Sequence, residues 1–201
     1  MKQDGSRLPL SIKEITLIAV FTAITAVLAQ IAIPLPFTPI PISLGIVAVY
    51  ISGLLLKPKH AVCSQLCYLA LGAVGVPVFV GFMGGISALF GPTGGFLMAY
   101  PLMAAAISYT VNGAKSLQTE PTRSRLRLYI KTGIAVTAAL CFAYLAGALW
   151  LSVTTGSSVY ISLTLVCFPF IPLDIAKIVF TVFVMLPLRA RLMRANLLQL
   201  Y

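Results

Sequence analysis

Long apolar runs separated by short polar or proline-rich segments form the main pattern of the chain. The first run, residues 14–33, is long enough at about 1.5 Å per residue to cross a hydrocarbon core about 30 Å thick. Further apolar runs predict helices at residues 42–56, 61–74, 94–112, 129–151 and 172–188. The pattern therefore predicts an all-α polytopic membrane protein with six transmembrane helices, forming a single domain over residues 1–201.

Prolines mark two interruptions in this pattern. Residues 34–41 hold four prolines and cannot be helical, because proline fixes φ and lacks a backbone N–H donor. In the last apolar region, Pro169 and Pro172 predict a break, and Pro172 suits the first turn of a helix. Residues 159–168 then form an interfacial or re-entrant segment on the outer side.

The composition agrees with a membrane location. The 201 residues are 60% hydrophobic and 9% charged, with a mean hydropathy of +1.03. A soluble domain of this size could not bury so much apolar surface. The net charge of +10 could suggest nucleic acid, but Lys and Arg fall in short clusters between apolar runs. We therefore expect the lipid bilayer, and no nucleic acid, as a partner.

The basic residues also predict the topology. All Lys and Arg except Lys177 fall in or beside residues 1–13, 57–60 and 113–131 and the chain end, and none falls in the other three loops. By the positive-inside rule, both termini are cytoplasmic. The proline loop, the glycine-rich loop and residues 152–171 share the opposite face. His60, beside two lysines, is expected to be solvated.

The glycine-rich residues 81–101 are uncharged and lie within an apolar sequence, unlike a flexible linker. Glycine lets other groups approach the main chain, and irregular backbone at membrane depth is tolerated where it lines a cavity or is buried in protein. We interpret the stretch as a structured loop shaped around a small ligand. A tightly packed or re-entrant connector without a ligand is the alternative.

Asp174 and Lys177 are the only charged residues in an apolar segment away from the predicted cytoplasmic loops, and their i,i+3 spacing places them on one helix face. Ionised groups at membrane depth are costly and indicate function. Asp174 could accept N–H bonds from a polar ligand while Lys177 donates to a carbonyl or carboxylate. Alternatively, the two residues form a mutual ion pair that locks the helix.

Small residues repeat on the first predicted helix. Ala19, Ala23 and Ala26 have the i,i+4 and i,i+3 spacing that lets membrane helices approach closely. They predict a partner-docking face, with internal packing as the alternative.

Several chemistries are missing from the sequence. There is no G-x-x-x-x-G-K-[ST] loop, so a partner must supply energy or transport is passive. One His, four acidic residues and four cysteines in apolar segments (Cys63, Cys67, Cys141, Cys167) predict free thiols, no metal site and no cofactor. No catalytic constellation can be assembled on the outer face, so we do not expect an enzyme.

Four motifs together resemble the BioY-type substrate-binding subunit, or S component, of energy-coupling-factor (ECF) biotin transporters. They are Leu-Gly-x-x-Gly-x-Pro-Val-Phe within residues 68–79, Gly84-Gly85, Gly-Pro-Thr-Gly-Gly at 91–95, and Asp174-x-x-Lys177. The resemblance extends from the first to the last predicted helix. It implies high-affinity biotin capture and uptake across the bacterial cytoplasmic membrane. A transmembrane scaffold protein and two cytoplasmic ATPases are the implied partners.

The resemblance also suggests the substrate-binding residues, which are Asp174, Lys177, Thr93, Gly84, Gly85, Phe82, Tyr100 and Phe37. Some family members carry an arginine or another polar residue shortly after the Gly-Pro-Thr-Gly-Gly motif, where it can meet the ligand carboxylate. Here residues 96–100 offer only Tyr100. Two alternatives remain: the same fold binding another vitamin or a biotin precursor, and a scaffold subunit that binds no ligand.

Overall fold

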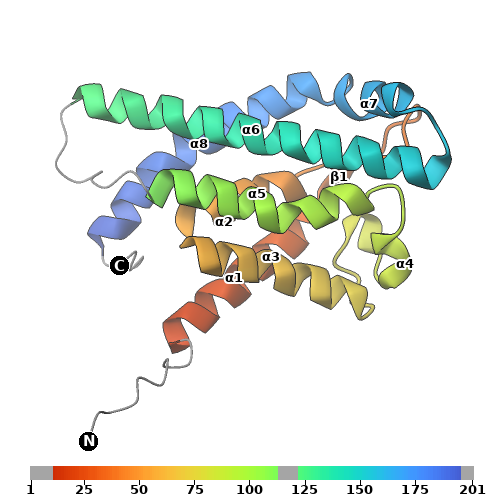
Figure 1. Ribbon diagram of the computed structural model, residues 1–201. Helices are drawn as coiled ribbons and strands as arrows, with labels where there is room; N and C mark the ends of the chain where they lie inside the picture. The colour runs from red at the N-terminus through yellow and green to blue at the C-terminus, as the bar shows by residue number, and fades with distance from the viewer. Residues whose placement is uncertain (1–10, 113–121, 196–201) are drawn as a thin grey trace, which may run out of the picture.

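The computed structural model describes residues 11–112 and 122–195, which form an elongated bundle of helices (Figure 1). The longer helices are α1 (Ile12–Gln30), α2 (Gly45–Leu55), α3 (Pro58–Ala73), α5 (Gly94–Asn112), α6 (Thr122–Thr155) and α8 (Ile171–Arg194). Each corresponds to one of the predicted helices. The shorter elements are β1 (Ala32–Ile33), β2 (Ile42–Ser43), η1 (Val80–Phe82), α4 (Ile86–Leu89) and α7 (Val159–Cys167). The predicted helical class is therefore confirmed.

Four helices in the described part of the chain are long and apolar enough to cross a membrane. They are α1, α5, α8 and the part of α6 from Leu126 to Thr155. The helices α2 and α3 are shorter, with 11 and 16 residues. The topology of six spans with cytoplasmic termini stays a prediction.

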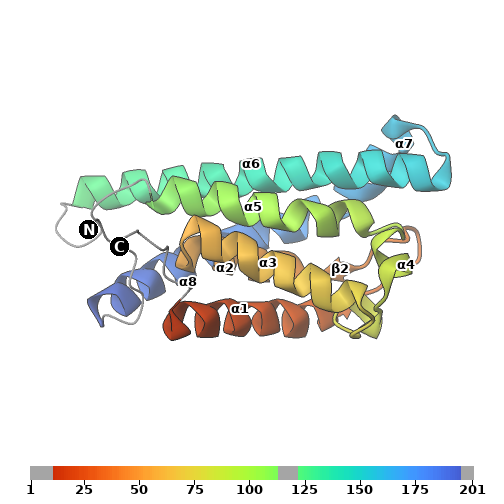
Figure 2. The same ribbon diagram turned by 60° about the horizontal axis from the view of Figure 1, so that its bottom comes forward.

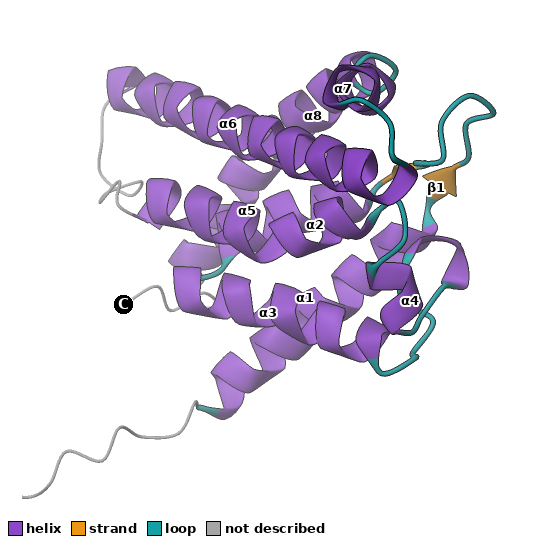
Figure 3. Ribbon diagram, turned by 45° about the vertical axis from the view of Figure 1, so that its right-hand side comes forward, coloured by secondary structure: helices purple, strands orange, loops and turns teal. Residues whose placement is uncertain are grey.

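The two ends of the bundle differ in composition. The start of α1, the turn between α2 and α3, the end of α5, the start of α6 and the end of α8 lie at one end (Figures 1 and 2). Apart from Lys177, the Lys and Arg residues of the described chain belong to these segments. The β1–β2 hairpin, α4 and α7 lie at the opposite end, named the outer end after the side on which the predicted topology would place it (Figure 3).

Local signals explain where the helices begin. Ser11 caps α1 through a capping box, in which its hydroxyl accepts from the Glu14 N–H at 3.3 Å and the Glu14 carboxylate accepts from the Ser11 N–H at 2.9 Å. Pro58 stands in the first turn of α3, and Ser158 caps α7. The Ser11 cap places the start of α1 at Ile12, two residues before the predicted position.

The predicted proline loop is the tip of a short antiparallel hairpin. Ala32 pairs with Ser43 and Ile33 with Ile42. Because Ile42 and Ser43 belong to this hairpin, α2 begins only at Gly45, later than predicted. The predicted break before the last helix is present, because α7 ends at Cys167 and α8 begins at Ile171.

The centre of the bundle is α2, in which every residue except Ile51 is buried. It packs against α1, α5 and α8, while α6 packs along α5. A Cβ added at Gly53 of α2 would lie 2.9 Å from the Cβ of Ile107 on α5. This glycine therefore permits the close approach of α2 and α5.

A buried arginine joins three helices at the end opposite the hairpin. Arg189 of α8 is 2% exposed. Its guanidinium donates to the Leu54 carbonyl of α2 and, at 2.6 Å, to the side-chain oxygen of Asn112 on α5. Ser108 and Asn112 in turn donate to the Leu56 carbonyl at 2.6 and 3.3 Å. We call Arg189, Asn112 and Ser108 the inner clasp.

The prediction that His60 is solvated is wrong. His60 is 7% exposed, and its Nε2 lies 3.3 Å from a carboxylate oxygen of Glu14. The first turn of α1 covers the start of α3, and Glu14 supplies the charged partner.

Candidate ligand-binding site

A cavity of about 60 Å³ lies near the outer end of the bundle, between β2, α2, α5, α6, α8 and the segment after α3. Its walls are mainly apolar and aromatic, with a few polar groups, as is typical of small-molecule sites. The lining residues are Ile40, Pro41, Ser43, Ile46, Phe79, Val80, Thr93, Phe96, Leu97, Tyr100, Tyr144, Phe170, Asp174 and Lys177.

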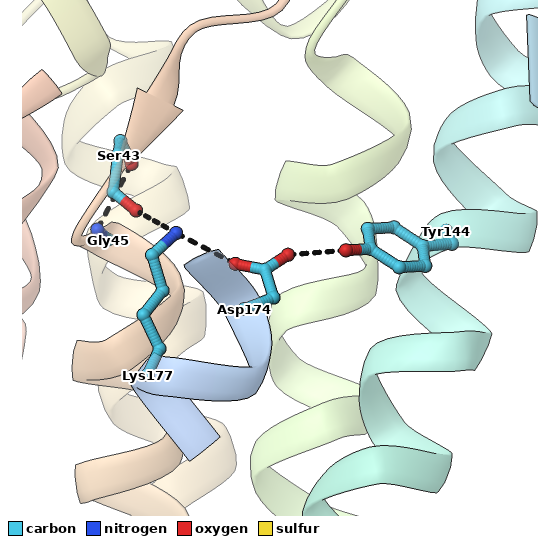
Figure 4. A network of polar contacts seen from close by, with 5 residues as sticks. All are labelled: Ser43, Gly45, Tyr144, Asp174 and Lys177. Carbon is cyan, nitrogen blue, oxygen red and sulfur yellow. Dashed lines mark hydrogen bonds and ion pairs between the residues drawn. The ribbon is translucent and has the colours of Figure 1, made fainter. Parts of the chain in front are cut away.

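Asp174 is the centre of the polar wall. It stands in the first turn of α8 and is 3% exposed. One carboxylate oxygen accepts from the Tyr144 hydroxyl of α6 at 2.5 Å, and the other accepts from the Lys177 ammonium at 2.8 Å (Figure 4). The amino-terminal end of a helix also favours a negative charge. These contacts keep a carboxylate stable at a depth where an unpaired one would be costly.

Lys177 extends this network to the hairpin. Its ammonium donates to the backbone carbonyl of Ser43 at 3.0 Å, so it lies between Ser43 and Asp174 (Figure 4). The Ser43 hydroxyl accepts from the Gly45 N–H at 3.0 Å and fixes the turn into α2. Three elements distant in sequence, β2, α6 and α8, therefore meet at one buried ion pair.

Aromatic rings form much of the remaining wall. The Tyr100 ring stacks on Tyr68, which does not itself line the cavity, with centroids 6.4 Å apart, and Phe96 meets Tyr144 edge to face at 6.5 Å. Contacts of this type restrict the rings to a few orientations. They give the cavity flat, rigid walls beside the ion pair.

The glycine-rich stretch is tightly packed, and one of its residues lines the cavity. A Cβ at Gly94 would overlap the Leu89 carbonyl, and one at Gly95 would overlap the Trp150 side chain. Trp150 donates to the Gly91 carbonyl at 2.9 Å. These two glycines, Gly94 and Gly95, allow tight packing of α5 on α6, while Thr93, the residue before Gly94, lines the cavity.

The structure brings together four of the predicted substrate-binding residues at this cavity: Asp174, Lys177, Thr93 and Tyr100. The other four, Phe37, Phe82, Gly84 and Gly85, are not among the described residues that line it. Phe37 and Phe82 are 60% and 71% exposed, and Gly84 packs against the backbone of Val76. The binding roles of all eight stay predictions.

Sequence reasoning did not identify Tyr144 or Ser43. Tyr144 lies in a long apolar helix, where no spacing signal links it to Asp174. Ser43 contributes its backbone carbonyl, which any residue could provide. The only sequence feature that marks Ser43 is its position just after the proline loop.

The predicted partner-docking alanines lie on an apolar groove of about 570 Å³ between α1 and α3. Its described lining residues are Ile15, Ile18, Ala19, Thr22, Ala23, Ala26, Cys67, Ala70, Leu71 and Val74. We call it the α1–α3 groove. Ala29, three residues after Ala26 on α1, does not line this groove and is buried within the bundle.

A metal centre is not evident in the described chain, where His, Cys, Asp and Glu form no group of three or more that could hold an ion. All four cysteines are free thiols.

Two solved structures share the fold. One is a crystal structure of the S-component for biotin from an ECF-type ABC transporter, with a TM-score of 0.78 and 30% identity, over 89% of this chain and 91% of that one. The other is an S component of a bacterial ECF transporter, with a TM-score of 0.55 and 22% identity, over 93% and 98% of the two chains. It supports the likeness of fold alone. The protein therefore has the fold of an S component, a class of membrane transporter subunit.

The sequence identifies the family within this class. The sequence profile of the BioY family matches residues 1–194. The chain belongs to the BioY family, whose members are transporter subunits rather than enzymes. The biotin transporter BioY of Lactococcus lactis subsp. cremoris is 30% identical over 89% of this chain and 91% of its own length.

Two further relatives match over a shorter range. The probable biotin transporters BioY of Pyrococcus horikoshii and Bacillus subtilis are each 47% identical to this chain. The matches cover 45% and 47% of this chain, and 54% and 52% of the relatives. The chain thus spans about half the length of these relatives.

Proposed function

We propose that this protein captures biotin with high affinity at the cavity beside Asp174 and Lys177, as the substrate-specific S component of an ECF transporter. The observation that carries the proposal is the buried carboxylate–ammonium pair on the wall of an otherwise apolar and aromatic cavity. The names of the relatives and of the solved S-component for biotin support this choice of ligand.

Biotin matches the chemistry of the cavity. Its bicyclic ring is largely apolar and carries a polar ureido edge, which offers N–H donors and a carbonyl. Asp174 accepts one hydrogen bond on each oxygen, from Tyr144 and from Lys177, but a carboxylate has about four lone-pair sites. It can therefore still accept a ureido N–H. Lys177, which has three N–H donors, retains one for a ligand carbonyl or carboxylate.

The volume of the cavity implies movement on binding. Sites for small molecules typically enclose about 300 to 1,000 Å³, whereas this cavity measures about 60 Å³. A ligand of the size of biotin therefore requires the walls to separate. The β1–β2 hairpin, whose strands have two residues each, is the part of the wall that is the natural one to move.

The proposal includes the membrane setting and the partners. The protein is a single multi-pass domain of the bacterial cytoplasmic membrane with six spans and cytoplasmic termini, and it docks on a transmembrane scaffold that carries two ATPases. The α1–α3 groove supports the docking face, because small residues line it on both helices. Replacing Ala23 by Leu should weaken copurification with the scaffold, whereas Val27→Leu, on the exposed face of α1, should not.

Ligand-dependent thermal stabilisation tests the function directly. A ligand at 100 times its dissociation constant adds about 2.7 kcal/mol to the free energy of unfolding. Biotin should raise the melting temperature of the purified protein, while thiamine and riboflavin should not. Stabilisation by another vitamin or a biotin precursor would favour the same fold with a different ligand. No stabilisation by any of these would favour a scaffold subunit in which Asp174 and Lys177 only pair.

A further inference from the structure

Residues 78–82, between α3 and α4, form one wall of the candidate cavity through Phe79 and Val80. We call them the wall segment. The segment folds back on itself, because the Phe79 N–H donates to the Met83 carbonyl at 2.9 Å. Side chains from α1 and α3 also make polar contacts with it.

Gln30, the last residue of α1, contacts the wall segment with both ends of its amide. Its Nε2 donates to the Val78 carbonyl at 2.9 Å and to the Phe79 carbonyl at 3.0 Å. Its Oε1 accepts from the Phe82 N–H at 2.9 Å. Phe82 has a φ of 57°, which is uncommon outside glycine. The amide of Gln30 therefore holds the backbone in a conformation that the sequence alone does not favour.

Tyr68 and Gly72 of α3 hold the segment from the other side. The Tyr68 hydroxyl donates to the Val78 carbonyl at 3.2 Å, and the Tyr68 and Phe79 rings meet edge to face at 5.5 Å. The Phe79 ring lies against Gly72, where a Cβ would overlap it. The Val78 carbonyl thus accepts one bond from α1 and one from α3.

From these contacts we infer that Gln30 is a positioning residue for the ligand site: it fixes the wall segment, and through it Phe79 and Val80, without reaching the cavity itself. The inference rests on the proposed function, because it requires that the cavity binds biotin. Gln30 is not among the described residues that line the cavity. Its effect on the ligand is therefore indirect.

The position of the segment explains why affinity depends on Gln30 more than folding does. Residues 78–82 lie outside the long helices, and Phe82 and Met83 are exposed. Without Gln30, the segment keeps the Tyr68 bond to Val78 and its own Phe79–Met83 backbone bond, and α1 still packs on α3. The wall then has several conformations, and biotin has to order it on binding, which weakens the affinity.

The test compares biotin binding by the full-length wild-type protein with Gln30→Met and Gln30→Asn. Methionine keeps the length of the side chain without the amide, and asparagine keeps the amide on a shorter side chain. The matched control is Thr22→Val. The Thr22 hydroxyl donates to the Ser64 carbonyl at 2.9 Å and so joins the same two helices away from the wall segment.

Both Gln30 variants should bind biotin about 10-fold more weakly and release it faster, as expected for lost hydrogen bonds. Thr22→Val should bind biotin within about twofold of wild type, because the Thr22 hydroxyl bonds to neither the wall segment nor a residue that lines the cavity. Ligand-free melting temperatures, measured on all four proteins, separate stability from affinity.

Three outcomes would contradict the inference. Wild-type affinity in both Gln30 variants would overturn it while leaving the proposed function intact. An equal loss of affinity in Thr22→Val would overturn it as well, since general loosening of α1 on α3 would then explain the effect. Absence of biotin binding in the wild-type protein would instead reject the proposed function, and the inference with it.

Discussion

Tyr144 of α6 and Asp174 of α8 stand 30 residues apart in the sequence and share a hydrogen bond of 2.5 Å in the wall of the cavity. The hydroxyl donates to one carboxylate oxygen while Lys177 holds the other. Asp174 is thereby fixed in orientation before any ligand arrives. Such preorganisation reduces the ordering that binding requires.

Replacing Tyr144 by Phe should therefore weaken biotin binding about 5-fold, since a bond to a charged group is lost while the ring remains. Isothermal titration calorimetry would measure the change. Tyr129→Phe is a suitable control, because Tyr129 lies on the same helix and packs its ring on Phe183 of α8. Equal affinity of the Tyr144→Phe variant and the wild type would mean that this hydroxyl does not orient the carboxylate.

Asp174→Asn should lower biotin affinity by roughly 5-fold to 150-fold, because a charge-assisted acceptor becomes neutral and a buried partner is left unsatisfied at a cost of about 1 to 3 kcal/mol. Lys177→Met should also weaken binding. Direct binding measurements on the wild type, both single variants and the double variant separate ligand contact from a structural ion pair. If the double variant recovered near-native affinity, neither residue would contact the ligand.

Gly95→Ala should lower the free energy of unfolding by about 1 to 3 kcal/mol, the usual cost of overpacking. The added Cβ would overlap Trp150 where α5 and α6 pack. Gly133→Ala, on α6, is the matched control, since no described atom lies within 4 Å of the added Cβ. That variant should keep or slightly raise stability, because alanine favours helix. Thermal denaturation that shows the opposite order would refute the packing role of Gly95.

Cysteine labelling in a cysteine-free background checks the topology. Ser157→Cys, between α6 and α7, should react with an impermeant reagent from outside. Lys59→Cys, at the start of α3, should react only after permeabilisation, because basic segments stay in the cytoplasm. Arg123→Cys, in the first turn of α6, should likewise react only after permeabilisation; the Arg123 side chain lies outside the described residues. The reverse labelling pattern would place the candidate cavity on the cytoplasmic side.

The sequence pattern predicts the six longer helices because apolar runs and proline breaks are properties of contiguous residues. It also brings Asp174 and Lys177 together, since i,i+3 spacing on a helix requires no tertiary information. The hairpin is different. Two-residue strands carry no periodicity, and the pairing of Ala32 with Ser43 depends on contacts across the proline loop.

The errors and omissions share a physical cause. The sequence favours a solvated His60 because two lysines closely precede it, but the packing of α1 on α3 determines its environment. Tyr144 looks like any aromatic residue of an apolar helix until α8 places Asp174 beside it. Burial and partners across helices depend on the tertiary arrangement, which hydropathy along one segment does not contain.

The inner clasp can form only late in synthesis, because its arginine lies on the last helix, α8. The central helix α2 has 11 residues, a length of about 16 Å, which is too short to cross a bilayer core alone. The carbonyl of Leu54 near its end accepts from Arg189, 135 residues later in the chain. The middle of the bundle is therefore synthesised early and receives this hydrogen bond only after α8 has left the ribosome. Until then, the Leu54 carbonyl lacks its arginine donor, whereas the Leu56 carbonyl can already accept from Ser108 of α5.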